Sequence, residues 1–70
     1  MNANTGRFAV QAFDESHNTW ITVSQDDRWE GADEAAKNLS LIYSKYYRVC
    51  DERIAETLGY YNAGRLEGRN

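Results

Sequence analysis

Apolar residues recur at spacings of three and four between Ala32 and Tyr46, in the run A-D-E-A-A-K-N-L-S-L-I-Y-S-K-Y. The residues that follow this spacing are Ala35, Ala36, Leu39, Ile42, Tyr43 and Tyr46. Such a pattern places them on one side of an α-helix, with polar residues on the other side. Gly31 can serve as the N-cap, and Asp33 and Glu34 put negative charge near the positive end of the helix dipole. We therefore predict a helix over 32–46 and expect the rest of the chain to pack against it.

Two runs before this helix alternate between the two faces of a strand. They are Arg7–Phe13 and Thr19–Ser24, and five turn-forming residues, Asp14–Asn18, join them. This pattern is typical of a β-hairpin. The side chains expected to meet the helix are Phe8, Val10, Ile21 and Val23. Phe13 and Trp20 are then left on the opposite face of the sheet.

The segment after the helix allows two interpretations. In one, the helix continues through Val49, Cys50, Ile54 and Leu58, and Gly59 terminates it. In the other, Tyr47–Asp51 and Glu56–Tyr61 form a second hairpin, since Tyr, Val, Cys and Thr favour strands. We favour the hairpin, because one long helix and a single hairpin would leave too little core. Val49, Leu58 and Tyr60 are the residues expected on its buried face.

Together these elements predict an α+β fold of ββαββ order, with a small antiparallel sheet of four strands and one helix packed on one face. Residues 7–61 are expected to form this single domain. Residues 1–6 are polar and patternless, which predicts a disordered N-terminus. Residues 62–70, with two glycines and two arginines, are expected to be a flexible C-terminal tail.

Composition narrows the function mainly by exclusion. The formal net charge is −3 and the basic residues are scattered, which disfavours nucleic acid as a partner. No apolar run is long enough for a membrane span or a secretory signal, so no membrane role is expected. Cys50 is the only cysteine and has no partner for an internal disulfide, which favours a reducing compartment and a cytoplasmic protein.

The chain carries more aromatic residues than one helix can shelter: two tryptophans, five tyrosines and two phenylalanines. Some of these rings must lie outside the core, and exposed clustered rings usually mark an interface. Phe13, Trp20, Arg48 and Tyr61 are expected on the open face of the sheet as partner-binding residues, because Trp, Tyr and Arg dominate binding hot spots. The loop before the helix is the most acidic stretch, and Asp26, Asp27 and Glu30 are its candidate contacts for a basic partner.

No pattern of residues supports catalysis. Asp14, Ser16 and His17 include the residue types of a catalytic triad, but they lie within one short turn, where a relay between separate elements is hard to build. The sequence contains no phosphate-binding glycine loop, no metal-ligand spacing and no cofactor motif. A chain of this size also has difficulty enclosing a ligand pocket. We therefore expect no cofactor, no metal and no enzymatic activity.

The run Y-Y-R-V-C-D-E-R-I-A-E-T-L-G-Y-Y-N, from Tyr46 to Asn62, follows an alanine-rich helix led by Trp29. It resembles the closing half of short phage- or prophage-encoded accessory proteins of hairpin–helix–hairpin type. The resemblance covers about half of the chain. It implies a small protein that acts by binding a host or phage protein, for example as an inhibitor.

Two functional hypotheses follow from the sequence. The first is a protein–protein interaction module that uses the aromatic sheet face and the acidic loop to bind a larger host protein. A second copy of the chain is another possible occupant, which would make the protein a homodimer. The alternative is a binder of single-stranded nucleic acid, with bases stacked on the same rings.

Overall fold

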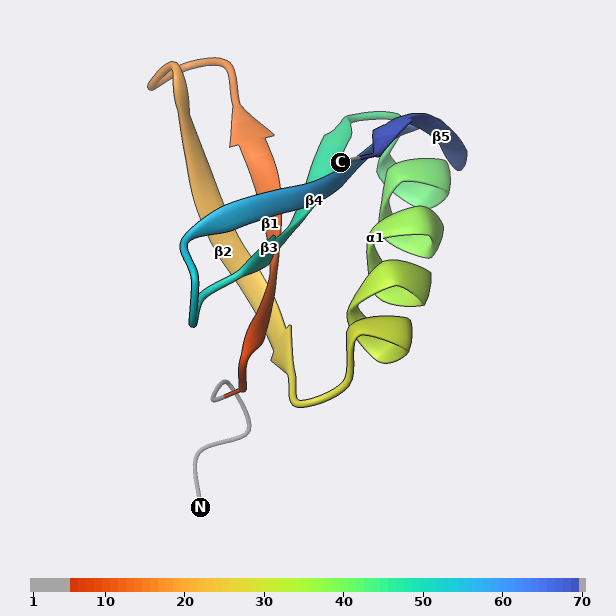
Figure 1. The fold of residues 1–70 in the computed structure, drawn as a ribbon. Helices are drawn as coiled ribbons and strands as arrows, with labels where there is room; N and C mark the ends of the chain where they lie inside the picture. Colours follow the sequence, from red (N-terminus) through yellow and green to blue (C-terminus); the bar gives the residue numbers. More distant parts are fainter. Residues whose placement is uncertain (1–5, 70) are drawn as a thin grey trace.

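The computed structural model describes residues 6 to 69, which form one helix and five strands (Figure 1). The strands are β1 (Phe8–Asp14), β2 (Thr19–Asp26), β3 (Tyr46–Asp51), β4 (Glu56–Asn62) and β5 (Arg65–Arg69), and the helix is α1 (Trp29–Tyr43). Residues 1–5 and 70 lie outside the described residues. The expectation of a disordered N-terminus falls almost entirely on them.

The five strands form one sheet with the order β2-β1-β3-β4-β5, and each neighbouring pair is antiparallel. The helix packs along one side of this sheet (Figure 1). The predicted α+β class, with one helix on one face of an antiparallel sheet, is confirmed. The favoured second hairpin is also confirmed, as β3 and β4, and the long continuous helix is wrong.

A fifth strand was not expected. β5 lies within residues 62–70, where a flexible tail is expected, and it pairs with β4. Ala63 and Gly64 connect the two strands, and both have positive φ, at 52° and 77°. Two successive left-handed residues are typical of the tight turns that match the twist of a hairpin. The domain therefore extends beyond residue 61 to at least residue 69.

The helix begins and ends three residues earlier than the apolar spacing predicted. Its N-cap is Arg28, which makes no side-chain cap, so the expected cap at Gly31 is wrong. The Asp26 carboxylate instead accepts a hydrogen bond from the Arg28 backbone N–H at 2.9 Å, which orders the chain just before the first turn. At the other end Ser44 adopts a left-handed conformation and donates its N–H to the Ser40 carbonyl, which terminates the helix before Tyr46.

Small side chains line the buried side of the helix. Its fully buried residues are Ala32, Ala36 and Ser40, which recur at successive turns. The core cluster consists of Val10, Ala32, Ala36, Tyr47, Val49 and Tyr61. The sheet therefore supplies most of the core volume. Ile42 and Tyr43, predicted on the buried side, are 68% and 59% exposed, and Tyr46 is exposed as well.

Register shifts occur in three of the strand pairs, and two of them, in β1–β2 and β3–β4, bear on which side chains face the helix. Between β1 and β2 the register places Val10 opposite Ser24 and Gln11 opposite Thr22, so Val23 is an extra residue. Ile21 and Val23 were expected to meet the helix, but each is 46% exposed, because β2 is an edge strand.

The second bulge falls between β3 and β4. Val49 pairs with Gly59 and Cys50 with Thr57, so Leu58 is the extra residue. Leu58 packs against the core as expected, but the bulge breaks the alternation that would have placed Tyr60 beside it. Tyr61 takes the core position instead.

Buried tyrosines bring hydroxyl groups that need partners. The Tyr61 hydroxyl donates to Asp33 on the helix at 2.6 Å, which ties β4 to α1. Tyr47, its neighbour across β3 and β4, is also buried. Burial raises the pKa of Tyr47 above its ordinary value, and the charge on nearby Tyr43 acts in the same direction.

An ion pair joins the start of β1 to the end of β3. The Arg7 guanidinium donates to both carboxylate oxygens of Asp51, at 2.9 Å, 3.1 Å and 2.7 Å. Asp51 is only 3% exposed, and its carboxylate also accepts a hydrogen bond from the Arg53 backbone N–H. The Arg7 carbonyl accepts from the Glu52 N–H at 2.8 Å, so both main chain and side chain hold this corner.

Several connections rest on left-handed residues other than glycine. They are Asn18, Ser44, Ala55 and Ala63, with φ between 51° and 53°. Each lies in a connection between two elements.

In the part of the chain that the structure describes, no helix has the length and apolar character that crossing a membrane requires.

We expect Ser40→Ala to destabilise the fold. The buried Ser40 hydroxyl accepts a hydrogen bond from the Gly64 N–H and donates one to the Lys37 carbonyl, each at 2.8 Å. Alanine leaves that N–H without its acceptor, which should lower the free energy of unfolding by about 1–3 kcal/mol in urea denaturation. The matched control is Asn38→Ala, an exposed position on the same helix. An equal loss in both variants would contradict the proposed link between α1 and the β4–β5 turn.

We expect Asp51→Asn to make stability less dependent on acid pH. Hydrogen bonds from Arg7 hold the pKa of Asp51 below its ordinary value of 3.8 in the folded chain. The ionised carboxylate therefore contributes stability above that ordinary pKa, and the contribution is lost as pH falls through the lower folded-state value. Melting temperatures between pH 2 and 7 should fall less steeply below about pH 4 in this variant than in the wild type.

The control for this measurement is Asp27→Asn, an exposed carboxylate at the far end of β2. Asp14 also has a lowered pKa, so some acid dependence should persist in Asp51→Asn. Identical acid profiles for wild type and Asp51→Asn would contradict a stabilising ion pair with Arg7.

Candidate interaction site on the open sheet face

Three aromatic side chains meet on the face of the sheet that the helix does not cover. Phe13 and Trp20 are paired across β1 and β2, and their rings meet edge-on with centroids 5.2 Å apart. The Trp20 and Tyr60 ring centroids lie 6.1 Å apart, at an angle of 56°. Ala12 and Tyr61, next to Phe13 and Tyr60 in sequence, pack into the helix-side core, and alternation places the rings on the other side.

Trp20 connects distant strands. It lies on β2 and reaches Tyr60 on β4, although β1 and β3 lie between these two strands. The indole therefore extends across much of the open face. Ring pairs at these distances and angles contribute stability beyond their buried area.

Arg48 completes the cluster from β3. Its guanidinium carbon lies 4.4 Å from the centre of the Trp20 ring, a cation–π contact. Its Nε donates to the Gln11 side-chain oxygen at 2.7 Å, and the Gln11 amide nitrogen donates to the Thr22 hydroxyl at 3.1 Å. Among residues 6–69 no carboxylate forms an ion pair with Arg48. We call Phe13, Trp20, Arg48 and Tyr60 the aromatic cluster.

The expected grouping of Phe13, Trp20 and Arg48 on one face is confirmed, while their role in binding stays a prediction. Tyr61 is wrong as an exposed residue, since it is 4% exposed in the core. Tyr60 occupies the place expected for Tyr61. The bulge at Leu58 determines which of the two tyrosines faces the core, and the sequence pattern does not reveal this bulge.

The acidic loop lies apart from the aromatic cluster. Asp26 ends β2 and is engaged by the Arg28 backbone N–H, while Asp27 is exposed. Glu30 is exposed in the first helical turn, 3.9 Å from the Arg28 guanidinium. Trp20 is at the opposite end of β2, roughly 20 Å away at about 3.4 Å per residue. The two predicted contact regions therefore form separate surfaces.

The triad residue types do come together, in an arrangement that does not form a relay. His17 Nδ1 lies 2.7 Å from Asp14 Oδ2 and 3.2 Å from the Ser16 hydroxyl, so one ring nitrogen meets both groups. A catalytic relay needs the carboxylate and the hydroxyl on different ring nitrogens. The Ser16 hydroxyl also donates to Asp14 Oδ1 at 2.6 Å.

These contacts have a structural explanation. The Asp14 carboxylate accepts the Ser16 N–H as well as its hydroxyl, which is typical of a turn held by an aspartate side chain. The hydrogen bond from Ser16, followed by that from His17, lowers the pKa of Asp14. Within residues 6–69 no group of three or more His, Cys, Asp or Glu side chains is placed to hold a metal ion.

Comparisons with protein-family models, with curated proteins and with solved structures find no match to this chain.

We expect a measurable coupling between Trp20 and Arg48. A double-mutant cycle with Trp20→Leu and Arg48→Met should give about 0.5–1 kcal/mol in the free energy of unfolding, the usual range for a partly exposed cation–π contact. The single variants account for the hydrogen bond to Gln11 and for lost ring contacts. Additive single-variant effects would show that the guanidinium and the indole do not interact.

Proposed function

We propose that this protein is a non-enzymatic cytoplasmic interaction module that binds a larger protein through the aromatic cluster. The observation that carries the proposal is the gathering of Phe13, Trp20, Tyr60 and Arg48 on the sheet face opposite the only helix of residues 6–69. Trp, Tyr and Arg are the residue types that dominate binding hot spots. The resemblance to phage-type accessory proteins suggests a host protein as the target, inhibited by the bound module.

The order within the cluster favours this role. The rings and the guanidinium already support one another in the free protein, so little side-chain freedom remains to be lost on binding. Loss of such freedom is one of the main costs of association. A half-buried, pre-ordered set of anchors is therefore a better basis for affinity than separate exposed rings.

The acidic loop fits the same proposal as a peripheral contact. A standard interface buries about 800 Å² on each partner, a patch roughly 30 Å across. A partner of that footprint spans the roughly 20 Å from Trp20 to the end of β2 when it is placed between the two regions, and it then contacts both the aromatic cluster and the region of Asp27 and Glu30. Exposed charges at the edge of an interface mainly affect the association rate and its salt dependence, so these carboxylates would steer a basic partner.

Single-stranded nucleic acid is the weaker candidate for the same face. Base stacking needs an open ring face, and the Arg48 guanidinium already covers one face of the Trp20 indole. The net charge of −3 also opposes a polyanion.

The test is capture of a partner by the immobilised protein from a lysate of the cells that express it. We expect a captured protein to be lost with Trp20→Ser and with Tyr60→Ser, while circular dichroism shows that both variants stay folded. The matched control is Ile21→Ser, which lies next to Trp20 on β2 and is 46% exposed on the other side. Its capture should equal that of the wild type.

Capture that survives in the Trp20→Ser/Tyr60→Ser double variant would overturn the proposal. Sedimentation of the purified protein at two concentrations identifies self-association through the same face. A salt-dependent fluorescence change with a single-stranded oligonucleotide would favour the nucleic-acid function instead.

A further inference from the structure

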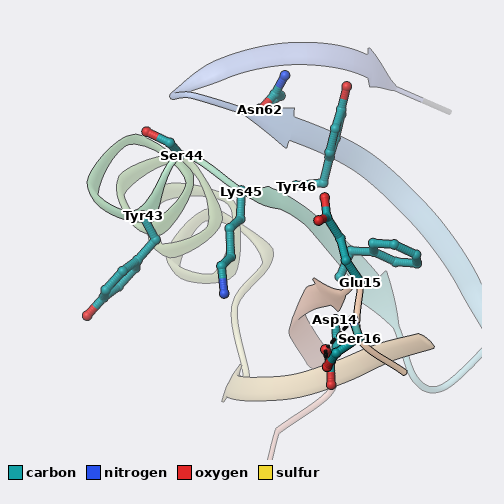
Figure 2. Close-up of a pocket in the computed structure, with 9 residues that line it drawn as sticks. Asp14, Glu15, Ser16, Tyr43, Ser44, Lys45, Tyr46 and Asn62 are labelled. Atoms are coloured by element: carbon teal, nitrogen blue, oxygen red, sulfur yellow. Dashed lines mark hydrogen bonds between the residues drawn. The ribbon is translucent and has the colours of Figure 1, made fainter. Parts of the chain in front are cut away.

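A cleft of about 550 Å³ shares Phe13 with the aromatic cluster, and Figure 2 shows the residues that line it. One wall is the β1–β2 turn at Asp14–Ser16, and the facing wall is the connection from α1 to β3 at Tyr43–Tyr46. Its volume is within the range of small-molecule sites. A chain of this size was expected to have difficulty enclosing a ligand pocket, but this cleft is open and lies between two connections. Phe13 belongs both to this cleft and to the aromatic cluster.

The two walls carry opposite charge. Lys45 extends from the α1–β3 connection into the space that separates it from the turn (Figure 2). Glu15 and Asp14 lie on the facing turn. Asp14 is engaged by Ser16 and His17, so Glu15 is the carboxylate available to a ligand. Within the described residues Lys45 forms no ion pair with either carboxylate.

Aromatic surface accompanies these charges. Phe13 and Tyr46 contribute rings to the lining. In sequence, Phe13 directly precedes Asp14 and Tyr46 directly follows Lys45. A ligand with one charge would satisfy one wall and meet like charge on the other, which is unfavourable. A ligand that carries both charges and an apolar group would satisfy all three features.

We propose that this cleft binds a small zwitterion of the α-amino-acid class that has an apolar side chain. Lys45 pairs with the ligand carboxylate, Glu15 pairs with its ammonium group, and Phe13 and Tyr46 contact its side chain. This site goes beyond the proposed protein partner and does not depend on it.

The test is an NMR titration of the full chain with three probes of matched size. L-phenylalanine carries both charges, phenethylamine carries only the ammonium group, and 3-phenylpropionate carries only the carboxylate. We expect saturable shifts of the amide signals of Glu15, Lys45 and Tyr46 with L-phenylalanine. Each single-charge probe should bind about tenfold more weakly or worse, since each lacks one charge-assisted contact.

Variants assign the two poles separately. Lys45→Met should weaken L-phenylalanine about tenfold and leave phenethylamine unchanged or tighter, because only the carboxylate loses its partner. Glu15→Gln should show the reverse, with 3-phenylpropionate unaffected or tighter. Lys37→Met, an exposed lysine on α1 outside the cleft lining, is the control and should change nothing.

Two results would overturn the zwitterion site. One is the absence of saturable shifts at 10 mM L-phenylalanine, a concentration that corresponds to binding weaker than about −3 kcal/mol. The other is phenethylamine binding as tightly as L-phenylalanine, which would show a site for cations alone. Neither result bears on the aromatic cluster, because the titration contains no protein partner and Trp20→Ser tests that surface separately.

Discussion

The fold depends on a stripe of small side chains at the contact between helix and sheet. Ala32, Ala36 and Ser40 occupy successive turns of α1 and leave little side chain between its backbone and the strands. Interiors are packed to a nearly constant density, so the sheet must fill the space that these residues leave. Tyr47 and Tyr61 do so, and their presence in the core follows from the small residues opposite them.

The same constraint determines where polar groups lie inside. A core filled with tyrosines contains hydroxyl groups that must be hydrogen-bonded, and Asp33 accepts from Tyr61. Ser40 is the one polar residue of the buried stripe, and it serves the backbone of the β4–β5 turn. In the described part of the chain no buried side-chain nitrogen or oxygen lacks a hydrogen-bond partner. The helix is thus joined to the final hairpin by polar contacts as well as by packing.

The pattern of the sequence predicts the elements better than it predicts their registers. Alternation in the first two strands and the spacing of apolar residues in the helix are local properties, and both predict the elements, although the helix lies three residues closer to the N-terminus than its spacing predicts. The bulges at Val23 and Leu58 are not local, because both residue types fit regular strands and only cross-strand packing selects the extra residue. β5 was missed because its sequence, R-L-E-G-R, is short, charged and interrupted by glycine.

The candidate site shows the same limit in one pair of residues. Tyr60 and Tyr61 are chemically identical, so composition can state that a tyrosine lies on the open face but not which one. The single extra residue at Leu58 reverses which of the two tyrosines faces the core. Phe13 and Arg48 were predictable because no bulge lies between them and the core residues next to them in sequence, and Trp20 was predictable because it pairs directly with Phe13.

Two connections of this fold contain strained residues, and relieving that strain would raise the stability of the protein. Ala55 and Ala63 adopt left-handed conformations, which cost L-residues with a β-carbon roughly 1–2 kcal/mol each. That is a large share of the net stability available to a domain of this size. Replacement by glycine or asparagine at such corners would release part of this strain without touching either face of the sheet. A protein with those replacements could then tolerate more destabilising substitutions in the aromatic cluster. The binding surface could therefore change in evolution while the fold is retained.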